Sequence, residues 1–363
     1  MKSHVLSTRK QPSLTKKLLP KLKKKTKKKL KHFRMFLEKQ FLAPRALLCG
    51  AFSLLFLTLF TSCDESRSTP DWPTSTPKLE EPAPTSPPPA PLEGPEVTFM
   101  SYNLKNYLSM PRGKSPATMR PKPENEIRAL VQNISSASPD ILGVCEIGTQ
   151  ADLDDLQRRL KQHGVDLPHT HLHGAADTYR RLAILSRFPI EATYPATEHY
   201  KMEGKSHLML RGILDAEIAL PAGPVRFIGV HLKSKRESKF WDQERIRRHE
   251  AQCVRNHINT LTQSSTTPII LYGDFNDTKQ SPTIRAISGS NQAPGYLLPL
   301  RLTDTQGAAW TQHWAYQDVY SRFDYIFVST HARPRINHSK SFILTLPTHD
   351  PASDHRPLIL NMR

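Results

Sequence analysis

The sequence has little cysteine, with four residues in 363. That number excludes a small fold held together by many disulfides. Cys49 and Cys63 lie near the N-terminus, outside the globular part. Cys145 and Cys253 fall in a predicted strand and a predicted helix, where free buried thiols are expected. One disulfide between these two, formed outside the cell, is the alternative.

Acidic residues are also scarce, with 33 Asp and Glu against 51 Lys and Arg. The imbalance is local, because residues 1–45 contain 16 basic residues and a single acid, Glu38. This basic leader is expected to be disordered; it could contact anionic lipid or nucleic acid, or have no partner. Met35 is an alternative start. Residues 96–363 have a net charge of only +7, which is compatible with a polyanionic substrate.

Long apolar runs are absent except for one, the uncharged stretch of 18 residues from Ala46 to Cys63. It is short for a spanning helix and typical of a secretory signal. Its end, Phe60-Thr-Ser-Cys63, resembles a bacterial lipobox, in which the cysteine receives lipid. We expect a signal with a lipobox or, alternatively, an uncleaved membrane anchor or simple secretion. Each places the protein in the cell envelope or beyond, on the periplasmic side or the cell surface.

Residues 64–95 form a Pro-rich linker that lacks the large apolar residues needed to fold. From Glu96 to Arg363 the chain alternates predicted strands and helices, without an internal repeat. Several strands are separated by connections too short for a helix, which favours a mixed sheet or two packed sheets. The predicted helices are 124–135, a segment around Leu153–Leu160, and 241–261. The predicted strands are 97–102, 140–145, 181–186, 211–220, 225–230, 268–272, 324–328 and 358–361.

Polar residues follow or precede many of these strands: Asn103, Glu146, His231, Asp274 with Asn276, Asp324, and Asp354 with His355. Singly, each has an ordinary explanation, since Asn and Asp are common in turns. Together they offer hard oxygen ligands and imidazoles at strand ends. That combination suits Mg²⁺-assisted attack on a phosphate ester.

Seven ordered segments resemble the endonuclease/exonuclease/phosphatase superfamily, which has the deoxyribonuclease I-like fold. They span residues 97–360 and are Ser101-Tyr-Asn-Leu104, Gly143-Val-Cys-Glu146, Leu182-Ala-Ile-Leu-Ser-Arg-Phe-Pro189, Gly229-Val-His-Leu-Lys-Ser234, Gly273-Asp-Phe-Asn-Asp277, Ser321-Arg-Phe-Asp-Tyr325 and Ser353-Asp-His-Arg-Pro357. The resemblance implies an α/β (α+β) fold, a four-layer sandwich of two packed mixed β-sheets flanked by helices. An exported bacterial member of the superfamily is expected.

The same resemblance implies a role for each matching residue. Glu146 corresponds to the principal metal carboxylate, with Asn103 and Asp354 beside the metal. Asp274 corresponds to the acid that orients or deprotonates the attacking water, and Asn276 to an amide on a phosphate oxygen. The remaining roles concern proton transfer: His355 contacts the phosphate or moves a proton, Asp324 is its partner, and His231 is a general acid on the leaving oxygen.

The function expected from these features is an Mg²⁺-dependent phosphodiester hydrolase, with Mn²⁺ as a substitute. It is expected to be a membrane-tethered, monomeric nuclease. The alternatives are a phospholipid or sphingomyelin-type phosphodiesterase, an inositol-phosphate phosphatase, and an inactive binding module. Two sets of residues have an open interpretation. The basic residues could contact phosphate or be ordinary surface charge: Arg180, Arg181, Lys233, Lys235 and Arg322. The aromatic residues could stack on a base or pack in the interior: Trp310, Trp314 and Tyr316.

Overall fold

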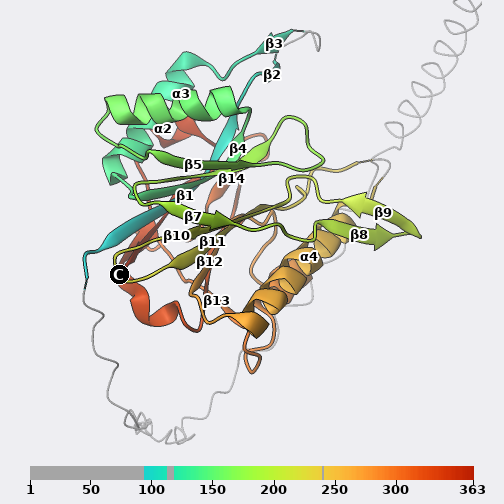
Figure 1. The fold of residues 1–363 in the computed structure, drawn as a ribbon. Coiled ribbons are helices and arrows are strands. Elements are labelled where there is room, and N and C mark those ends of the chain that lie inside the picture. Colours follow the sequence, from blue (N-terminus) through green and yellow to red (C-terminus); the bar gives the residue numbers. More distant parts are fainter. Residues whose placement is uncertain (1–93, 113–117, 239–240) are drawn as a thin grey trace, which may run out of the picture. The chain divides into compact units, whose positions relative to one another are not determined.

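The computed structural model describes residues 94–112, 118–238 and 241–363 (Figure 1). The basic leader, the apolar run and all of the linker up to residue 93 lie outside the described residues, so the expectations for them remain predictions. Within the described part, no helix is long and apolar enough to cross a membrane.

The first sheet has one parallel pair, β1 with β4, and its other pairs are antiparallel. Strand β18 lies between β17 and β1, although about 250 residues separate it from β1 in sequence. The strand order is β17 (Ile336–Ile343), β18 (Leu358–Met362), β1 (Val97–Tyr107), β4 (Ile141–Ile147), β6 (Arg181–Ser186) and β5 (His169–His173).

The second sheet repeats this plan, since β11 and β12 are parallel and the other pairs are antiparallel. Its strand order is β13 (Leu297–Pro299), β16 (Asp324–Ser329), β12 (Ile269–Asp274), β11 (Val225–His231), β10 (Ile213–Ile218) and β7 (Ile190–Thr193). Three small hairpins stand apart from both sheets: β2 (Met110–Pro111) with β3 (Met119–Arg120), β8 (His199–Met202) with β9 (Lys205–Leu208), and β14 (Gln312–Trp314) with β15 (Val319–Ser321).

Alternation along the strands divides the apolar side chains between layers. Phe99 of β1 faces the second sheet, whereas Met100 faces the helices. Helices α2 (Glu124–Ala137) and α3 (Gln150–Gln162) cover the outer face of the first sheet, and α4 (Gln243–Ser264) with α5 (Pro282–Ser288) covers that of the second. The short elements are α6 (His349–Ala352) and the 3-10 turn η2 (Arg333–Arg335). The predicted four-layer sandwich of two mixed sheets is therefore confirmed.

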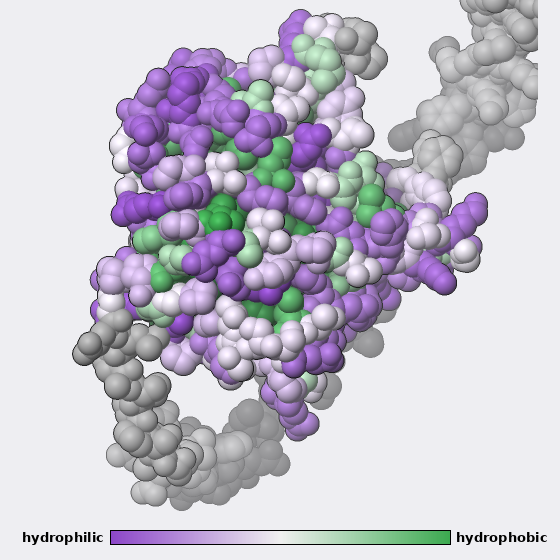
Figure 2. Space-filling model, viewed as in Figure 1, coloured by the Kyte–Doolittle hydropathy of each residue, from purple (hydrophilic) through white to green (hydrophobic). Residues whose placement is uncertain are grey.

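Local signals explain where several helices begin. Helix α3 starts with a capping box, in which Thr149 and Asp152 exchange hydrogen bonds. Helix α4 starts at Asp242, whose carboxylate accepts from the amide of Arg245 at 3.1 Å. The two described cysteines, Cys145 and Cys253, are free and buried, as expected. The view in Figure 2 shows a largely hydrophilic face with small apolar patches.

Candidate active site

The ends of strands from both sheets converge and carry the predicted polar residues. Asn103 lies in β1 and Glu146 in β4 of the first sheet, and His355 lies in the segment just before β18 of that sheet. In the second sheet, register places His231 opposite Asp274 and Asp274 opposite Asp324. The site therefore lies where the two sheets face each other, and each sheet supplies part of it.

Asp274 is the centre of the hydrogen-bond network. Its Oδ2 accepts from Asn103 Nδ2 at 3.1 Å and from Asn276 Nδ2 at 3.1 Å, and its Oδ1 accepts from the Asn276 amide at 2.8 Å. The carboxylate is buried, and burial raises the pKa of Asp274 to about 7, although the charge of His355 opposes the rise. A carboxylate of that basicity suits proton transfer near neutral pH.

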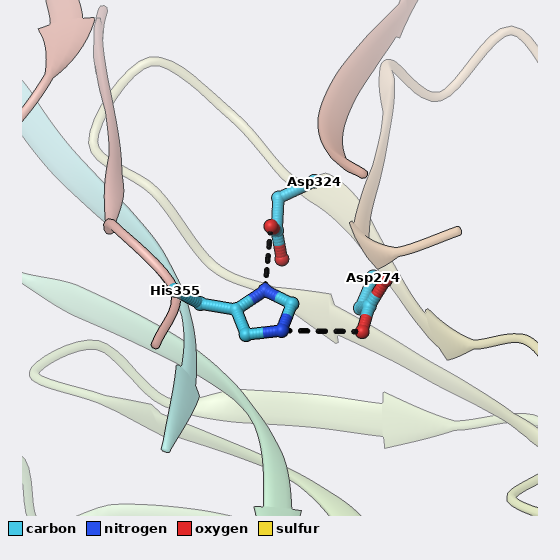
Figure 3. Close-up of side chains that lie close together, drawn as sticks. All are labelled: Asp274, Asp324 and His355. Atoms are coloured by element: carbon cyan, nitrogen blue, oxygen red, sulfur yellow. Dashed lines mark hydrogen bonds and ion pairs between the residues drawn. The ribbon is translucent and has the colours of Figure 1, made fainter. Parts of the chain in front are cut away.

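His355 lies between two carboxylates (Figure 3). Its Nδ1 is 2.8 Å from Asp324 Oδ2, and its Nε2 is 3.9 Å from Asp274 Oδ2. Burial alone would lower the pKa of His355. The charge and hydrogen bond of Asp324, aided by Asp274, outweigh burial and raise the pKa to about 10. The ring is therefore a protonated imidazolium at neutral pH, with its Nε2–H toward Asp274.

Glu146 adopts a backbone conformation that non-glycine residues rarely use, with φ of +64°. The register between β1 and β4 also shifts beyond Asn103. The Glu146 carboxylate accepts from the amide of Asn106 at 2.9 Å and lies 3.8 Å from Arg180 Nε. Lys105 and Asn106 also have positive φ. This unusual backbone turns the Glu146 side chain into the cleft instead of into a sheet layer.

His231 is buried, with its Nε2 at 3.5 Å from Asp274 and 3.9 Å from Glu146. Burial, followed by the charges of Arg211 and His355, holds the pKa of His231 well below its ordinary value. A neutral imidazole accepts a proton or donates one hydrogen bond; it is not charged as His355 is. Asp354 is partly exposed at the cleft, and its neighbour Ser353 donates from Oγ to the carbonyl of Asn103 at 2.8 Å.

These groups border a cleft of about 1050 Å³. Six predicted residues line it. Asn103 and Asp324 do not line the cleft, but Asn103 hydrogen-bonds to Asp274 and Asp324 hydrogen-bonds to His355. The six are Glu146, His231, Asp274, Asn276, Asp354 and His355. The cleft also has five basic residues: Lys105, Arg180, Arg211, Lys233 and Arg236. All eight predicted residues are thus brought together around one opening.

Oxygen donors suited to a hard cation are present. Glu146 presents a partly exposed carboxylate to the cleft, and Asp354 does so nearby. The Oδ1 of Asn103 already accepts from the Lys105 amide at 3.0 Å, which leaves it one lone pair. The buried Oδ1 of Asn106, next to Glu146, has no hydrogen-bond partner among the described residues. The donor set therefore fits a divalent cation beside Glu146.

A second arrangement competes with this one. Asp274, Asp324 and His355 also place donor atoms within 4.8 Å of one another. Their atoms are already used, because His355 Nδ1 bonds to Asp324 Oδ2 and Asp274 Oδ2 accepts from Asn103 and Asn276. We therefore interpret this group as the proton-transfer part of the site.

Several important residues carry no local sequence signal. Thr311 Oγ1 accepts from the amides of Phe323 and Asp324, both at 3.0 Å, and its carbonyl accepts from the amide of Arg356 at 2.7 Å. This buried threonine joins the strand of Asp324 to the segment of His355. Arg211 and Glu250 also shape the cleft wall from a loop and a helix. Such roles depend on contacts between distant segments, which residue patterns do not encode.

Two groups of residues, basic and aromatic, had more than one interpretation from the sequence, and the structure separates those that face the cleft from those that have structural partners. Arg180 and Lys233 line the cleft. The others have structural partners: Lys235 pairs with Asp277 at 2.6 Å, Arg181 with the carbonyl of Gly148, and Arg322 with that of Leu300. Trp310 packs under Arg356, with the guanidinium 3.8 Å from the ring centre.

Trp314 and Tyr316 do not pack in the interior, so the packing interpretation is wrong for them. Trp314 is about half exposed and Tyr316 is 85% exposed. They form an exposed aromatic hairpin with Val319 and Tyr320 of β15. Gln312 of the same hairpin lines the cleft and bridges to His355, so the hairpin stands beside the site.

Three comparisons place this geometry among known proteins. No curated protein matches the chain. Similar solved structures include the human nocturnin catalytic domain with a bound sulfate anion (TM-score 0.53, 18% identity, 74% of this chain and 94% of that chain). They also include an endonuclease/exonuclease/phosphatase from Bacteroides vulgatus (0.52, 16%, 74% and 99%) and a Staphylococcus aureus beta toxin mutant with bound magnesium ions (0.50, 15%, 74% and 100%).

At these identities the structures support the fold. The decisive finding is a family model, described as Endonuclease/Exonuclease/phosphatase family, which matches residues 100–355. That range begins in β1 and ends at His355, so it includes all eight residues gathered at the cleft. The chain therefore belongs to the endonuclease/exonuclease/phosphatase family, whose members are generally phosphoester hydrolases.

Proposed function

We propose that this protein is a divalent-metal-dependent phosphodiesterase that cleaves nucleic acid. The observation that carries the proposal is the placement of Asp274 and protonated His355 beside Glu146, at the base of a cleft with five basic residues. The bound cation, Mg²⁺ or Mn²⁺, would neutralise charge on the phosphoryl oxygens and polarise the scissile group. Glu146 and Asp354 would hold it, with Asn103 beside them.

The chain's own residues divide the remaining tasks. Asp274, fixed by three hydrogen bonds, orients the attacking water and accepts its proton. His355 donates from Nε2 to a phosphoryl oxygen, because Asp324 holds its Nδ1 and keeps the ring charged. Asn276 Nδ2 donates to Asp274 Oδ2 at 3.1 Å and to the carbonyl of Leu232 at 3.0 Å, so a contact of its amide with a phosphate oxygen would replace one of these bonds. His231, expected from the resemblance to be a general acid, would instead donate a hydrogen bond to the leaving oxygen as a neutral ring, because burial lowers its pKa, and the leaving oxygen would take its proton from water.

A nucleic-acid substrate is supported by charge. The five basic side chains of the cleft outnumber the acidic ones that have no proposed catalytic or metal-binding role. Each contact between a basic side chain and a phosphate adds to the affinity for a polyanion. The sulfate in the nocturnin structure and the magnesium in the beta toxin structure agree with an anion and a metal on this fold. An inositol-phosphate phosphatase would share the charge argument, and the substrate comparison below separates the two.

One specific observation favours a phospholipid head-group phosphodiesterase as the second candidate. The exposed aromatic hairpin of Trp314, Tyr316, Val319 and Tyr320 stands beside the cleft and could enter a lipid interface. Exposed aromatic side chains can equally stack on unpaired bases. The paired change Trp314→Ser with Tyr316→Ser would distinguish these, by lowering turnover of vesicles in one case and of single-stranded DNA in the other.

We further propose that the protein is exported and tethered to the membrane as a monomer. This part rests on the sequence, namely the apolar run ending at Cys63 and the Pro-rich linker after it. Metabolic labelling with a radioactive fatty acid, compared between the wild type and Cys63→Ser, tests lipidation. Label retained by the Cys63→Ser protein would exclude Cys63 as the lipid site.

The direct test of activity compares substrates in parallel. Purified full-length chain with Mg²⁺ is incubated with plasmid DNA, single-stranded DNA, RNA, sphingomyelin vesicles and inositol phosphates. We expect nucleic acid to be cleaved by the wild type, and Asp274→Ala or EDTA to reduce the rate by about 10²–10⁴-fold. Turnover confined to lipid or inositol phosphate would replace the proposed substrate. Failure of Glu146→Ala and chelation to change any rate would favour a binding module.

A further inference from the structure

Arg211 is a buried cation that the catalytic set does not use. It precedes β10, is 7% exposed and lines the cleft. Its Nε and Nη1 find no hydrogen-bond partner among the described residues, although Nε lies 3.3 Å from Asp177 Oδ2. Unsatisfied buried donors are costly and uncommon. Their position at a cleft indicates that an acceptor is supplied by a ligand.

The backbone around Arg211 is held in place. Glu250 of α4 is fully buried; one carboxylate oxygen accepts from the amide of Leu210 at 3.1 Å and the other from that of Lys233 at 2.7 Å. This single side chain joins the segment before Arg211 to the segment after His231. Gly212 follows with φ of +76°, where a Cβ would lie 2.3 Å from the Glu198 carboxylate. Arg211 is thus positioned by its surroundings, as a binding group must be.

Two further cations share this wall of the cleft. Arg180 Nη1 lies 3.9 Å from Asp177 Oδ2, so both arginines approach the same carboxylate. The charge of Arg211 acts on both His231 and Lys233, where it contributes to their lowered pKa after burial. Asp177 faces both arginines, and the buried carboxylate of Glu250 acts on Arg211 and Lys233, so three cations face two carboxylates in the wall next to His231.

We propose that Arg211, with Arg180 and Lys233, forms a second anion subsite that binds a phosphate neighbouring the scissile one in a polynucleotide. This inference rests on the proposed function and specifies its substrate class. The arginine fork matches two oxygens of one phosphate. A phosphocholine head group would bring its cation toward this wall and be repelled. A substrate with one phosphate would leave the subsite empty.

The test uses substrates that share one scissile bond. Thymidylyl-thymidine has a single phosphodiester, and its 5′- and 3′-phosphorylated forms each add one neighbouring phosphate. We expect the full-length wild type to prefer one phosphorylated form. In Arg211→Gln, kcat/KM for that form should fall about 10–100-fold, a larger loss than for thymidylyl-thymidine, so that the preference for the phosphorylated form disappears. Arg211→Lys, which keeps the charge without the fork, should give an intermediate loss.

A binding measurement that does not require turnover accompanies the kinetics. Fluorescein-labelled thymidine hexanucleotide is titrated in EDTA at several salt concentrations. Loss of one phosphate contact in Arg211→Gln should reduce the slope of log K against log salt by about 0.7–1. The matched control is Arg285→Gln, an exposed arginine of α5 outside the cleft lining, which should change neither the slope nor the preference.

The outcomes separate the inference from the function beneath it. Oligonucleotide cleavage with the same phosphate preference in wild type and Arg211→Gln would keep the nuclease and overturn the subsite. An equal loss on all three substrates with an unchanged salt slope would also overturn it. Binding that depends on Arg211 without any cleavage would support the subsite and reject the proposed nuclease. Thermal melting confirms folding, and Arg211→Lys supplies the comparison if Arg211→Gln does not fold.

Discussion

At the scale of single residues, the site depends on Asp274 and His355, because their surroundings shift the pKa of each in a direction that suits proton transfer. Burial raises the pKa of Asp274 toward neutrality, and Asp324 keeps His355 charged. An acceptor and a donor of protons are thereby present together at one pH. Neither environment belongs to the residue itself, because each arises from neighbours on other strands.

Replacing Asp324 by Asn should discharge His355. Without the carboxylate, the lowering effect of burial prevails and the His355 pKa should fall from about 10 to neutral pH or below. His355 then loses its proton as the pH rises through neutrality instead of near pH 10, so the alkaline limit of activity moves down. At pH 8 we expect kcat to fall by about 10²–10⁴-fold. NMR titration of metal-free protein measures the pKa, and a pH–rate profile measures the limit.

Asp304→Asn is the matched control for that experiment. Asp304 pairs with Arg356 at 2.9 Å, next to His355 in sequence, and is not among the main groups that shift the His355 pKa. The control should leave the His355 titration in place. An unchanged titration in Asp324→Asn itself would show that Asp324 does not set the charge of His355.

At the scale of elements, the two sheets approach closely around Tyr272 of β12. A Cβ on Gly143 of β4 would lie 2.2 Å from the Tyr272 ring, and one on Gly229 of β11 would lie 2.7 Å from its hydroxyl. The Tyr272 hydroxyl is buried without a hydrogen-bond partner among the described residues. Both glycines are therefore required by the ring. The spacing they allow sets how near Glu146 of β4 comes to Asp274 of β12.

Gly143→Ala should test this spacing. Overpacking should lower the free energy of unfolding by about 1–3 kcal/mol. It should also reduce activity, because the added methyl group pushes β4 and β12 apart and so changes the distance between Glu146 and Asp274. Urea unfolding and kcat/KM are measured for Gly143→Ala, Tyr272→Leu and the double variant. Since Tyr272→Leu makes room for the methyl group, the double variant should lose less than the sum of the single variants. Additive losses would mean that the ring and the glycine do not set the spacing.

At the scale of the whole molecule, the described domain contains the entire candidate site, whereas the segment before it contributes charge and a Pro-rich linker. A chain beginning at Glu96 should therefore keep its thermal midpoint and cleave soluble oligonucleotides within about twofold of the full-length rate. Only the full-length chain should sediment with membrane vesicles. A large loss of stability or rate in the shorter chain would show that the leader or linker contacts the domain.

Much of this fold was predictable from sequence, and the reasons are local. Strands such as 225–231 and 269–274 are apolar runs that end in polar residues, and Thr149 with Asp152 marks the start of α3. Weakly patterned strands were missed, including β5, which is half-buried, and β17, whose centre is polar and exposed. Helix α5, which begins at the Ser281 cap, was also missed.

The candidate site also has a part that could be predicted from the sequence and a part that could not. Its eight residues were predictable because each stands at a strand end within an ordered motif. The functions of Arg211, Thr311 and Glu250 were not, since they arise where a loop, a buried turn and a helix meet the strands. The exposure of Tyr316 was equally hidden, because an aromatic residue in sequence does not reveal whether a layer covers it.

The position of β18 has a consequence for the order of events during synthesis. This strand lies between β1 and β17, and His355 immediately precedes it. While a ribosome is still making the second sheet, β1 has left the tunnel but lacks its antiparallel neighbour, and the site lacks its charged imidazole. The first sheet can close only after residue 362 has emerged. Activity is thereby withheld from every unfinished chain, and β1, the longest strand among the described residues, stays unpaired on one side until late.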